Sequence, residues 1–202
     1  MVVSGATALR DAAVALVPSG APVVVADAGV DHARAAGLEI TLAVGDFDSV
    51  AEPPEGVEVE RHPAEKDATD LELALDAALA FDPGRLLVLS GVGSRLDHFA
   101  VELGLIASPR LAEVEVDAVF DATTVNVVRS ERRLAGRVAD LVSLVPVHGP
   151  AVGVRTEGLR YALRGETLEP GSSRGTSNLF AEPEAKVSLE HGVLLAIRPP
   201  SG

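Results

Sequence analysis

The sequence predicts an α/β protein, with an N-terminal open and mostly parallel sheet flanked by helices and a C-terminal all-β sandwich domain. Two observations predict this arrangement. Strand-like and helix-like patterns alternate as far as Val128, and from Arg132 onward only short strand-like runs remain, separated by turn residues. The chain has 202 residues, of which 47% are hydrophobic, so it can bury a substantial core. We therefore expect two domains, residues 1–128 and 129–202.

The first domain contains short continuous apolar runs, which are typical of strands buried on both faces. These runs are residues 23–26, 42–44 and 86–89. Helices are expected between them, at residues 6–17, 30–36, 69–81 and 97–107. The third helix has the clearest signal, because its apolar residues recur at three- and four-residue steps and Thr69 with Glu72 forms a capping box.

The second domain is predicted to contain strands at residues 141–147, 159–163, 186–190 and 193–198. His191 and Gly192 form a predicted hairpin turn, and residues 169–173 a loop. A domain of about 70 residues has a marginal core. We therefore expect it to rest on the first domain or on a second copy of the chain.

Composition excludes several classes of function. The formal net charge of −13 argues against nucleic acid or an anionic membrane as a partner. The chain has no cysteine, which excludes disulfides and thiolate catalysis, and its histidines lack zinc-like spacing. The first residues lack the pattern of a secretory signal, and no apolar run is long enough to span a bilayer. We expect a soluble, cytoplasmic protein.

Acidic residues follow the strand predicted at 42–44. Asp46 and Asp48 are two residues apart, so in an extended segment their carboxylates point the same way and can share a magnesium ion. The alternative is an acidic turn in which Asp48 or Ser49 caps a helix. The pattern is common and by itself does not decide between the two.

A second acidic motif surrounds the start of the helix at 69–81. Asp67 and Asp70 lie three residues apart, which places them on one helix face, although acids in a first turn also simply complement the helix dipole. Lys66 precedes them and is one of only two lysines in the chain. A compact ammonium group beside the acids suits phosphate oxygens.

The third motif follows the strand at 86–89. Gly91 and Gly93 allow backbone amides to approach phosphate, and Arg95 can bind phosphate through two nitrogens, while Asp97 is a further acid or a helix cap. Asp27 follows the strand at 23–26. Since ligands of open α/β sheets bind at the carboxyl ends of the strands, these motifs together predict a magnesium–polyphosphate site.

In order and spacing these residues resemble the thiamine pyrophosphokinase (thiamine diphosphokinase) family. The likeness covers nearly the whole chain, because C-terminal stretches are similar to that family's β domain. The segments that carry it are residues 26–29, 45–49, 66–70, 93–98, 143–146, 156–161 and 175–178. The resemblance implies a magnesium-dependent transfer of the terminal diphosphate of ATP to the hydroxyl of thiamine, giving thiamine diphosphate and AMP. It also implies a homodimer with shared sites.

The resemblance implies a role for each matching residue. The catalytic set is Asp46, Asp48, Lys66, Asp70, Arg95 and Asp97, and magnesium would be held by Asp46, Asp48, Asp67 and Asp70. ATP would be bound by Asp27, Thr69, Gly93, Ser94 and Arg95. Thiamine would be bound in the C-terminal domain by Ser177 and Asn178, with Phe180, outside the matching segments, as a further candidate. The proton acceptor is left open between Asp97 and a metal-site acid.

The chain departs from the family pattern at Ser94 and Ala28, where the family usually has glycine. It also has no tryptophan to stack on thiamine, which leaves Phe180 and Tyr161 as candidates. Two other functions remain as alternatives: a non-catalytic nucleotide- or vitamin-sensing module, and an aspartate-dependent phosphatase. The phosphatase fits less well, because Ser49 and Val50 stand where its motif needs glycine and threonine.

Overall fold

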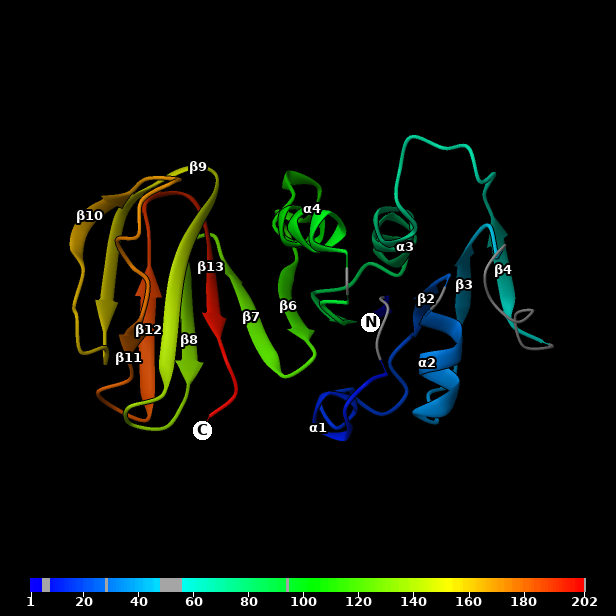
Figure 1. Cartoon of the computed structure of the whole chain (residues 1–202), viewed down its shortest axis with the longest axis horizontal. Helices are drawn as coiled ribbons and strands as arrows, with labels where there is room; N and C mark the ends of the chain where they lie inside the picture. Colours follow the sequence, from blue (N-terminus) through cyan, green and yellow to red (C-terminus); the bar gives the residue numbers. More distant parts are fainter. Residues whose placement is uncertain (5–7, 28, 48–55, 94, 202) are drawn as a thin grey trace. The chain divides into compact units, whose positions relative to one another are not determined.

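A computed structural model describes the chain apart from residues 5–7, 28, 48–55, 94 and 202 (Figure 1). It divides into two compact units. The first unit comprises Met1–Leu105 and Val114–Ala122, and the second comprises Ile106–Glu113 and Thr123–Gly202. The strand at Thr123–Val128 belongs to the second unit, whereas the boundary drawn from the sequence placed it in the first.

The first unit is built on a parallel sheet. Its strands are β1 (Val2–Val3), β2 (Val24–Ala26), β3 (Leu42–Gly45), β4 (Glu58–Arg61), β5 (Arg85–Ser90) and β6 (Glu115–Phe120). They lie in the order β4-β3-β2-β1-β5-β6, and each neighbouring pair is parallel. This confirms the predicted mostly parallel sheet, and it brings the carboxyl ends of β2, β3 and β5 to one edge.

The strands that the sequence predicts are those with fully apolar, buried runs. All residues of β2 and β3 are buried, as expected for strands covered on both faces. Three strands of the first unit were not predicted. β1 has only two residues, β4 is an edge strand whose residues are all exposed, and β6 carries a buried acid, Asp117, that is paired with Arg85 at 2.5 Å.

Four helices of the first unit are α1 (Asp11–Val14), α2 (Gly29–Ala35), α3 (Asp70–Leu79) and α4 (Leu96–Ile106). α3 begins as predicted, because the Thr69 hydroxyl accepts a hydrogen bond from the Glu72 amide at 3.2 Å. α1 is much shorter than predicted, since Arg10 is still extended and carries no capping hydrogen bond. At the start of α2, a Cβ on Gly29 would lie 2.4 Å from the Val3 carbonyl oxygen, so this helix begins tightly against β1.

The second unit is a strand-rich domain. Its elements are a short 3₁₀ helix (Pro109–Leu111), β7 (Thr123–Val128), β8 (Glu131–Ala135), β9 (Leu141–Glu157), β10 (Arg164–Leu168), β11 (Asn178–Leu179), β12 (Glu184–Ser188) and β13 (His191–Arg198). The order is β7-β13-β9-β12-β8, with β10 and β11 also on β9. The recorded pairings within this unit are antiparallel.

The long strand β9 connects two layers (Figure 1). Its first part pairs with β13, and its second part pairs with β10 and β12. Between the two parts, His148 has a left-handed backbone (φ 61°), which re-aims the strand. The core between the layers is apolar and includes Leu144, Leu168, Phe180 and Leu194. The predicted C-terminal sandwich is therefore confirmed, but two of its local predictions are wrong.

Residues 159–163 do not form a strand, since only Leu159 makes an isolated bridge, to Phe180. His191 and Gly192 are not a hairpin turn, because His191 begins β13, which pairs with β7 and β9 and not with β12.

Within the described residues, no helix combines the length and the apolar character needed to cross a membrane.

Candidate active site

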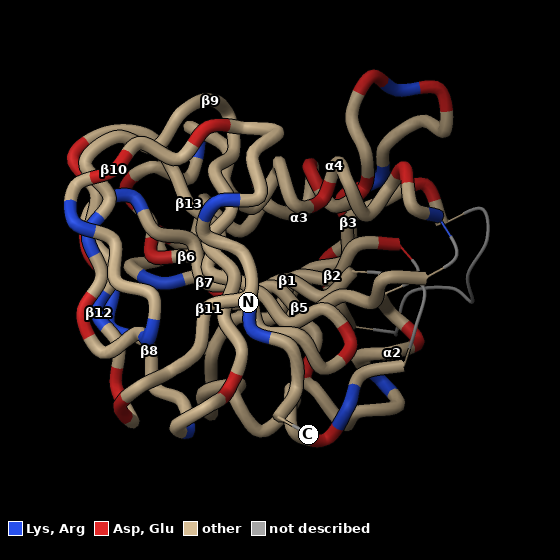
Figure 2. Tube along the Cα trace, turned by 60° about the vertical axis from the view of Figure 1, so that its left-hand side comes forward, with Lys and Arg blue, Asp and Glu red and all other residues tan. Residues whose placement is uncertain are grey.

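A cavity of about 620 Å³ opens at the carboxyl edge of the parallel sheet in the first unit. Its walls come from the residues after β2, β3 and β5, from the segment that leads into α3, and from the first turns of α4. Acidic positions recur along these elements (Figure 2). Eight of the predicted site residues line it: Asp27, Asp46, Lys66, Thr69, Asp70, Gly93, Arg95 and Asp97.

Lys66 lies between two carboxylates on one side of this cavity. Its Nζ is 3.0 Å from Asp46 Oδ2 and 2.8 Å from Asp70 Oδ1. Only 13% of the Lys66 side chain is exposed. Burial lowers the pKa of Lys66, but the hydrogen bonds and charges of Asp70 and Asp46 outweigh this effect, so the pKa is raised overall. The lysine is therefore firmly cationic and neutralises the two acids.

The donor set here suits a hard divalent cation. Two carboxylates converge on one point, and carboxylate oxygens are the ligands that magnesium prefers. Asp48 lies outside the described residues, and Asp67 is exposed and does not line the cavity. In the part of the chain that the structure describes, no three His, Asp or Glu side chains form a group that could hold a metal ion. The four-aspartate metal site remains a prediction.

Arg95 and Asp97 form a separate, exposed ion pair at the cavity. Arg95 donates from Nε to Asp97 Oδ1 (2.9 Å) and from a terminal nitrogen to Oδ2 (2.6 Å). The hydrogen bonds from Arg95 hold the pKa of Asp97 well below its usual range. Asp97 is thus a weak base in this arrangement, whereas Arg95 is placed to exchange one anionic partner for another.

The loop between β5 and α4 is held by a hydrogen bond to the residue that follows β6. The Val92 amide donates to Asp121 Oδ2 at 3.2 Å, and Gly93 has a left-handed backbone (φ 58°) that favours glycine. Ser94 lies outside the described residues. Asp27, which follows β2 and also lines the cavity, has a positive φ (31°) too. The loop brings Gly93 into the cavity, as the phosphate-binding prediction requires.

Sequence reasoning missed Glu102, which lines the same cavity from α4. Its Oε2 accepts a hydrogen bond from the Ser90 hydroxyl at 3.0 Å. Burial raises the pKa of Glu102, although the Ser90 hydrogen bond and the charge of His98 oppose this. In the sequence Glu102 looks like any helical glutamate, so no local signal could have found it.

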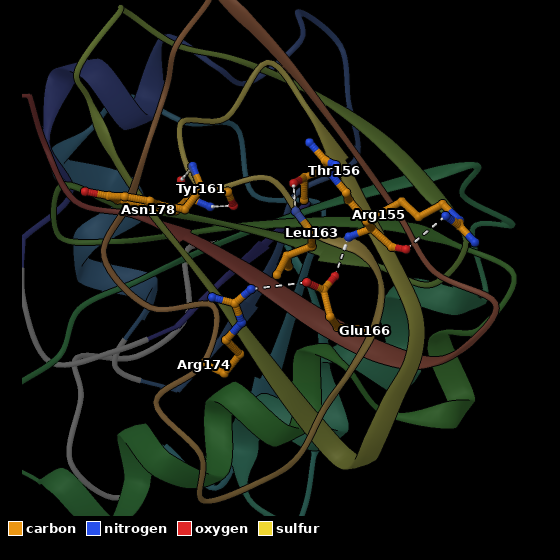
Figure 3. Close-up of polar contacts among 8 residues, drawn as sticks. Arg155, Thr156, Tyr161, Leu163, Glu166, Arg174 and Asn178 are labelled. Atoms are coloured by element: carbon orange, nitrogen blue, oxygen red, sulfur yellow. Dashed lines mark hydrogen bonds and ion pairs between the residues drawn. The ribbon is translucent and has the colours of Figure 1, made fainter.

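The second unit has its own cavity of about 420 Å³, lined by Tyr161, Leu163 and residues 172–178. Asn178 organises one wall (Figure 3). Its Oδ1 accepts from the amides of Tyr161 and Leu179, each at 2.9 Å, and its Nδ2 donates to the Tyr161 carbonyl at 2.8 Å. Asn178 is buried, and its amide therefore holds Tyr161 in place.

Two further residues, Ser177 and Arg174, bring exposed polar groups to this cavity. The Ser177 amide donates to Ser143 Oγ at 3.1 Å, while the Ser177 side chain is exposed at the cavity. Arg174, which also lines the cavity, pairs with Glu166 at 3.2 Å (Figure 3). Ser177 and Arg174 thus supply a hydroxyl and a cation that a ligand can reach.

Phe180 requires a correction. It was predicted as a thiamine-binding residue and a candidate for stacking, but it is 2% exposed and belongs to the apolar core of the second unit. A Cβ on Gly136 would lie 2.8 Å from its ring, so the ring is packed directly against that glycine. Tyr161, by contrast, is 52% exposed and lines the cavity, with the Arg160 guanidinium 5.7 Å from its ring centre.

Two family models match the chain. Residues 15–117 match "Thiamin pyrophosphokinase, catalytic domain", and residues 123–194 match "Thiamin pyrophosphokinase, vitamin B1 binding domain". A curated thiamine pyrophosphokinase of Bacillus subtilis is 26% identical over 178 residues, which is 81% of this chain and 80% of that protein.

Solved structures show the same fold. The thiamine pyrophosphokinase structure from Bacillus subtilis has a TM-score of 0.85 at 21% identity, covering 100% of this chain and 99% of that one. The thiamin pyrophosphokinase structure from Geobacillus thermodenitrificans has a TM-score of 0.80 at 25% identity, covering 100% of this chain and 97% of that one. The cavity of the first unit is lined by residues inside the span matched to the catalytic-domain model, together with Ser4.

Proposed function

Because the chain belongs to the thiamin pyrophosphokinase family, we propose that it transfers the terminal diphosphate of ATP to the hydroxyl of thiamine, releasing AMP. The observation that carries the proposal is the convergence of Asp46 and Asp70 on Lys66 in a cavity at the carboxyl edge of the sheet. This edge is where open α/β sheets bind their ligands. The cavity volume suits a nucleotide-sized ligand.

Charge neutralisation is the main task in such a transfer. Asp46 and Asp70, with Asp48 and Asp67 as further predicted ligands, would hold magnesium, which would offset the negative charge of the phosphates. Lys66 lies beside Asp46 and Asp70 as a cation. Arg95 would exchange its pairing with Asp97 for a phosphate group, which it would bind through two nitrogens.

The vitamin would be held by the second unit. Ser177 offers a hydroxyl and Tyr161 an exposed ring at the cavity there, while Asn178 keeps Tyr161 in place. An aromatic face suits the cationic ring of thiamine. We propose a homodimer with shared sites, as the family resemblance implies.

The test is the formation of AMP from ATP and thiamine in the presence of magnesium. Asp46→Asn and Asp70→Asn should each lower kcat by about 100-fold or more, because each removes a carboxylate that positions charge in the transition state. Asp76→Asn is the matched control, since Asp76 is exposed on α3 and does not line the cavity. Wild-type turnover in both cavity variants at saturating magnesium contradicts the site.

The same assay separates the two alternatives. A sensing module would bind ATP or thiamine without forming AMP, and a phosphatase would release inorganic phosphate without thiamine. AMP and thiamine diphosphate appearing in equal amounts excludes both.

A further inference from the structure

The acids of the first cavity differ in their partners. Asp46 and Asp70 face the ammonium group of Lys66, and Asp97 faces the guanidinium of Arg95. Glu102 instead accepts a hydrogen bond from a neutral hydroxyl, that of Ser90, at 3.0 Å. Acids paired with cations are stabilised as anions and are poor proton acceptors. The charges of Lys66 and Arg95 are not among the causes that shift the pKa of Glu102.

The position of Glu102 is fixed by two elements of the parallel-sheet unit. Ser90 is the buried last residue of β5, and Glu102 is in the second turn of α4, where it is half-buried and lines the cavity. Burial raises the pKa of this carboxyl, and a higher pKa makes a carboxylate a stronger base. His98, one turn earlier on the same helix, opposes the shift without cancelling it.

On the premise of the proposed function, we propose that Glu102 accepts the proton of the thiamine hydroxyl as that oxygen attacks the β-phosphorus of ATP. The new oxygen–phosphorus bond forms as the bond from the β-phosphorus to the bridging oxygen of the α-phosphate breaks. AMP leaves with that oxygen and its electron pair, so it needs no proton. The proton on Glu102 passes to water after the products depart. Ser90 is the positioning residue for this carboxylate.

One other acid must be tested beside it. Asp27 lines the same cavity from the end of β2 and is half-buried. Asp27→Asn is therefore the matched variant for Glu102→Gln, because each replaces one half-buried carboxylate by the isosteric amide.

The experiment measures kcat and both Michaelis constants for AMP formation by the full chain. A wild-type chain that forms no AMP overturns the proposed function itself. If the wild type is active, Glu102→Gln should lower kcat by about 100-fold or more, the usual range for loss of a general base. The Michaelis constant for ATP should change less than about twofold, because the variant keeps the contacts that bind ATP equally in the ground state and the transition state. Glu102→Asp should keep intermediate activity.

Chemical rescue separates a chemical role from a structural one. Glu102→Ala opens space in the cavity, and sodium formate, a small carboxylate, should restore part of its kcat in proportion to formate concentration. Ser90→Ala should lower kcat less than Glu102→Gln does. Wild-type kcat in Glu102→Gln, loss of kcat without rescue by formate, or formate rescue of Asp27→Ala alone overturns the assignment.

Discussion

At the scale of single residues, Lys66 holds together the charges of the first cavity. Its ammonium group lies within 3.0 Å of both Asp46 and Asp70, so it keeps two carboxylates that would otherwise repel each other in a compact arrangement. Arg95 has a different role. Its pair with Asp97 is exposed and contributes little to stability. The Lys66 pairs are partly buried and the Arg95 pair is exposed, so we expect Arg95 to exchange its partner for a ligand more readily.

Lys66→Met should destabilise the protein by about 1–3 kcal/mol in the absence of magnesium, because it leaves two half-buried carboxylates facing each other. Magnesium should then raise Tm by more in the variant than in the wild type, since the ion replaces the missing charge. Thermal unfolding with and without magnesium measures both effects. Lys186→Met is the control, as Lys186 pairs with an exposed Glu131. Equal magnesium shifts in Lys66→Met and wild type would count against a cation site here.

Glu102→Gln should raise stability at neutral pH. Burial raises the folded-state pKa of Glu102 above its unfolded value, while Ser90 and the charge of His98 partly oppose this. The folded state therefore binds this proton more tightly, and stability falls as pH rises from the unfolded pKa through the folded one. Above both values the wild type bears a buried charge that the amide lacks.

The corresponding measurement is Tm as a function of pH. The variant should melt higher than the wild type at neutral pH, and the gain should vanish below the ordinary glutamate pKa of about 4.3. A variant that melts lower than the wild type at neutral pH would show that the carboxylate stabilises the fold instead.

Alanine variants of Phe180 and Tyr161 should differ in their effects on stability and on thiamine binding. Phe180→Ala should cost about 3–5 kcal/mol of unfolding free energy, because it empties a core position. Tyr161→Ala should change stability by less than about 0.5 kcal/mol, since its ring is largely exposed. It should raise the Michaelis constant for thiamine severalfold and leave that for ATP unchanged. The reverse pattern would restore Phe180 as the stacking residue.

At the scale of elements, the close start of α2 against β1 constrains the wall that carries Asp27. Gly29→Ala should destabilise the first unit by about 1–3 kcal/mol, because the new methyl group would lie 2.4 Å from the Val3 carbonyl oxygen, which is backbone and cannot move aside. Gly84→Ala serves as the control, with open space around its Cβ position. Urea unfolding of the two variants makes the comparison. Equal midpoints would mean that α2 shifts freely.

The elements that could be predicted from the sequence have local signals. β2, β3 and β5 are apolar runs, and α3 combines apolar periodicity with the Thr69 cap. β4 lacks such a signal because an edge strand with both faces exposed needs no apolar residues. α1 was overestimated because its alanine-rich sequence favours helix, but nothing caps it before Asp11.

The site residues that could be predicted are those that stand next to the end of a predicted strand or the start of a predicted helix. Asp27 and Asp46 follow predicted strands, Asp70 begins the predicted helix α3, and the structure brings the three to one cavity. Phe180 shows the limit. It follows Asn178 by two residues and both are buried, but the sequence pattern cannot say whether a buried side chain faces a ligand or the core.

At the scale of the whole molecule, the prediction of a homodimer remains to be tested. The second unit leaves apolar side chains exposed, among them Val138, Leu141 and Val152. Light scattering at micromolar concentration should give twice the chain mass of 20.8 kDa. An active monomer would contradict both the dimer and the idea of shared sites.

The position of β13 governs when the second unit can assemble during synthesis. This strand lies between β7 and β9, which precede it by many residues and reach the ribosome exit first. Until His191–Arg198 emerges, β7 and β9 each present an unpaired edge, and such edges invite pairing with other nascent chains. The last strand of the parallel-sheet unit ends at Phe120, so this unit can fold before the rest of the chain is synthesised. Folding on the ribosome should therefore occur in two separate steps, with the β-rich unit closing only after its last strand is released.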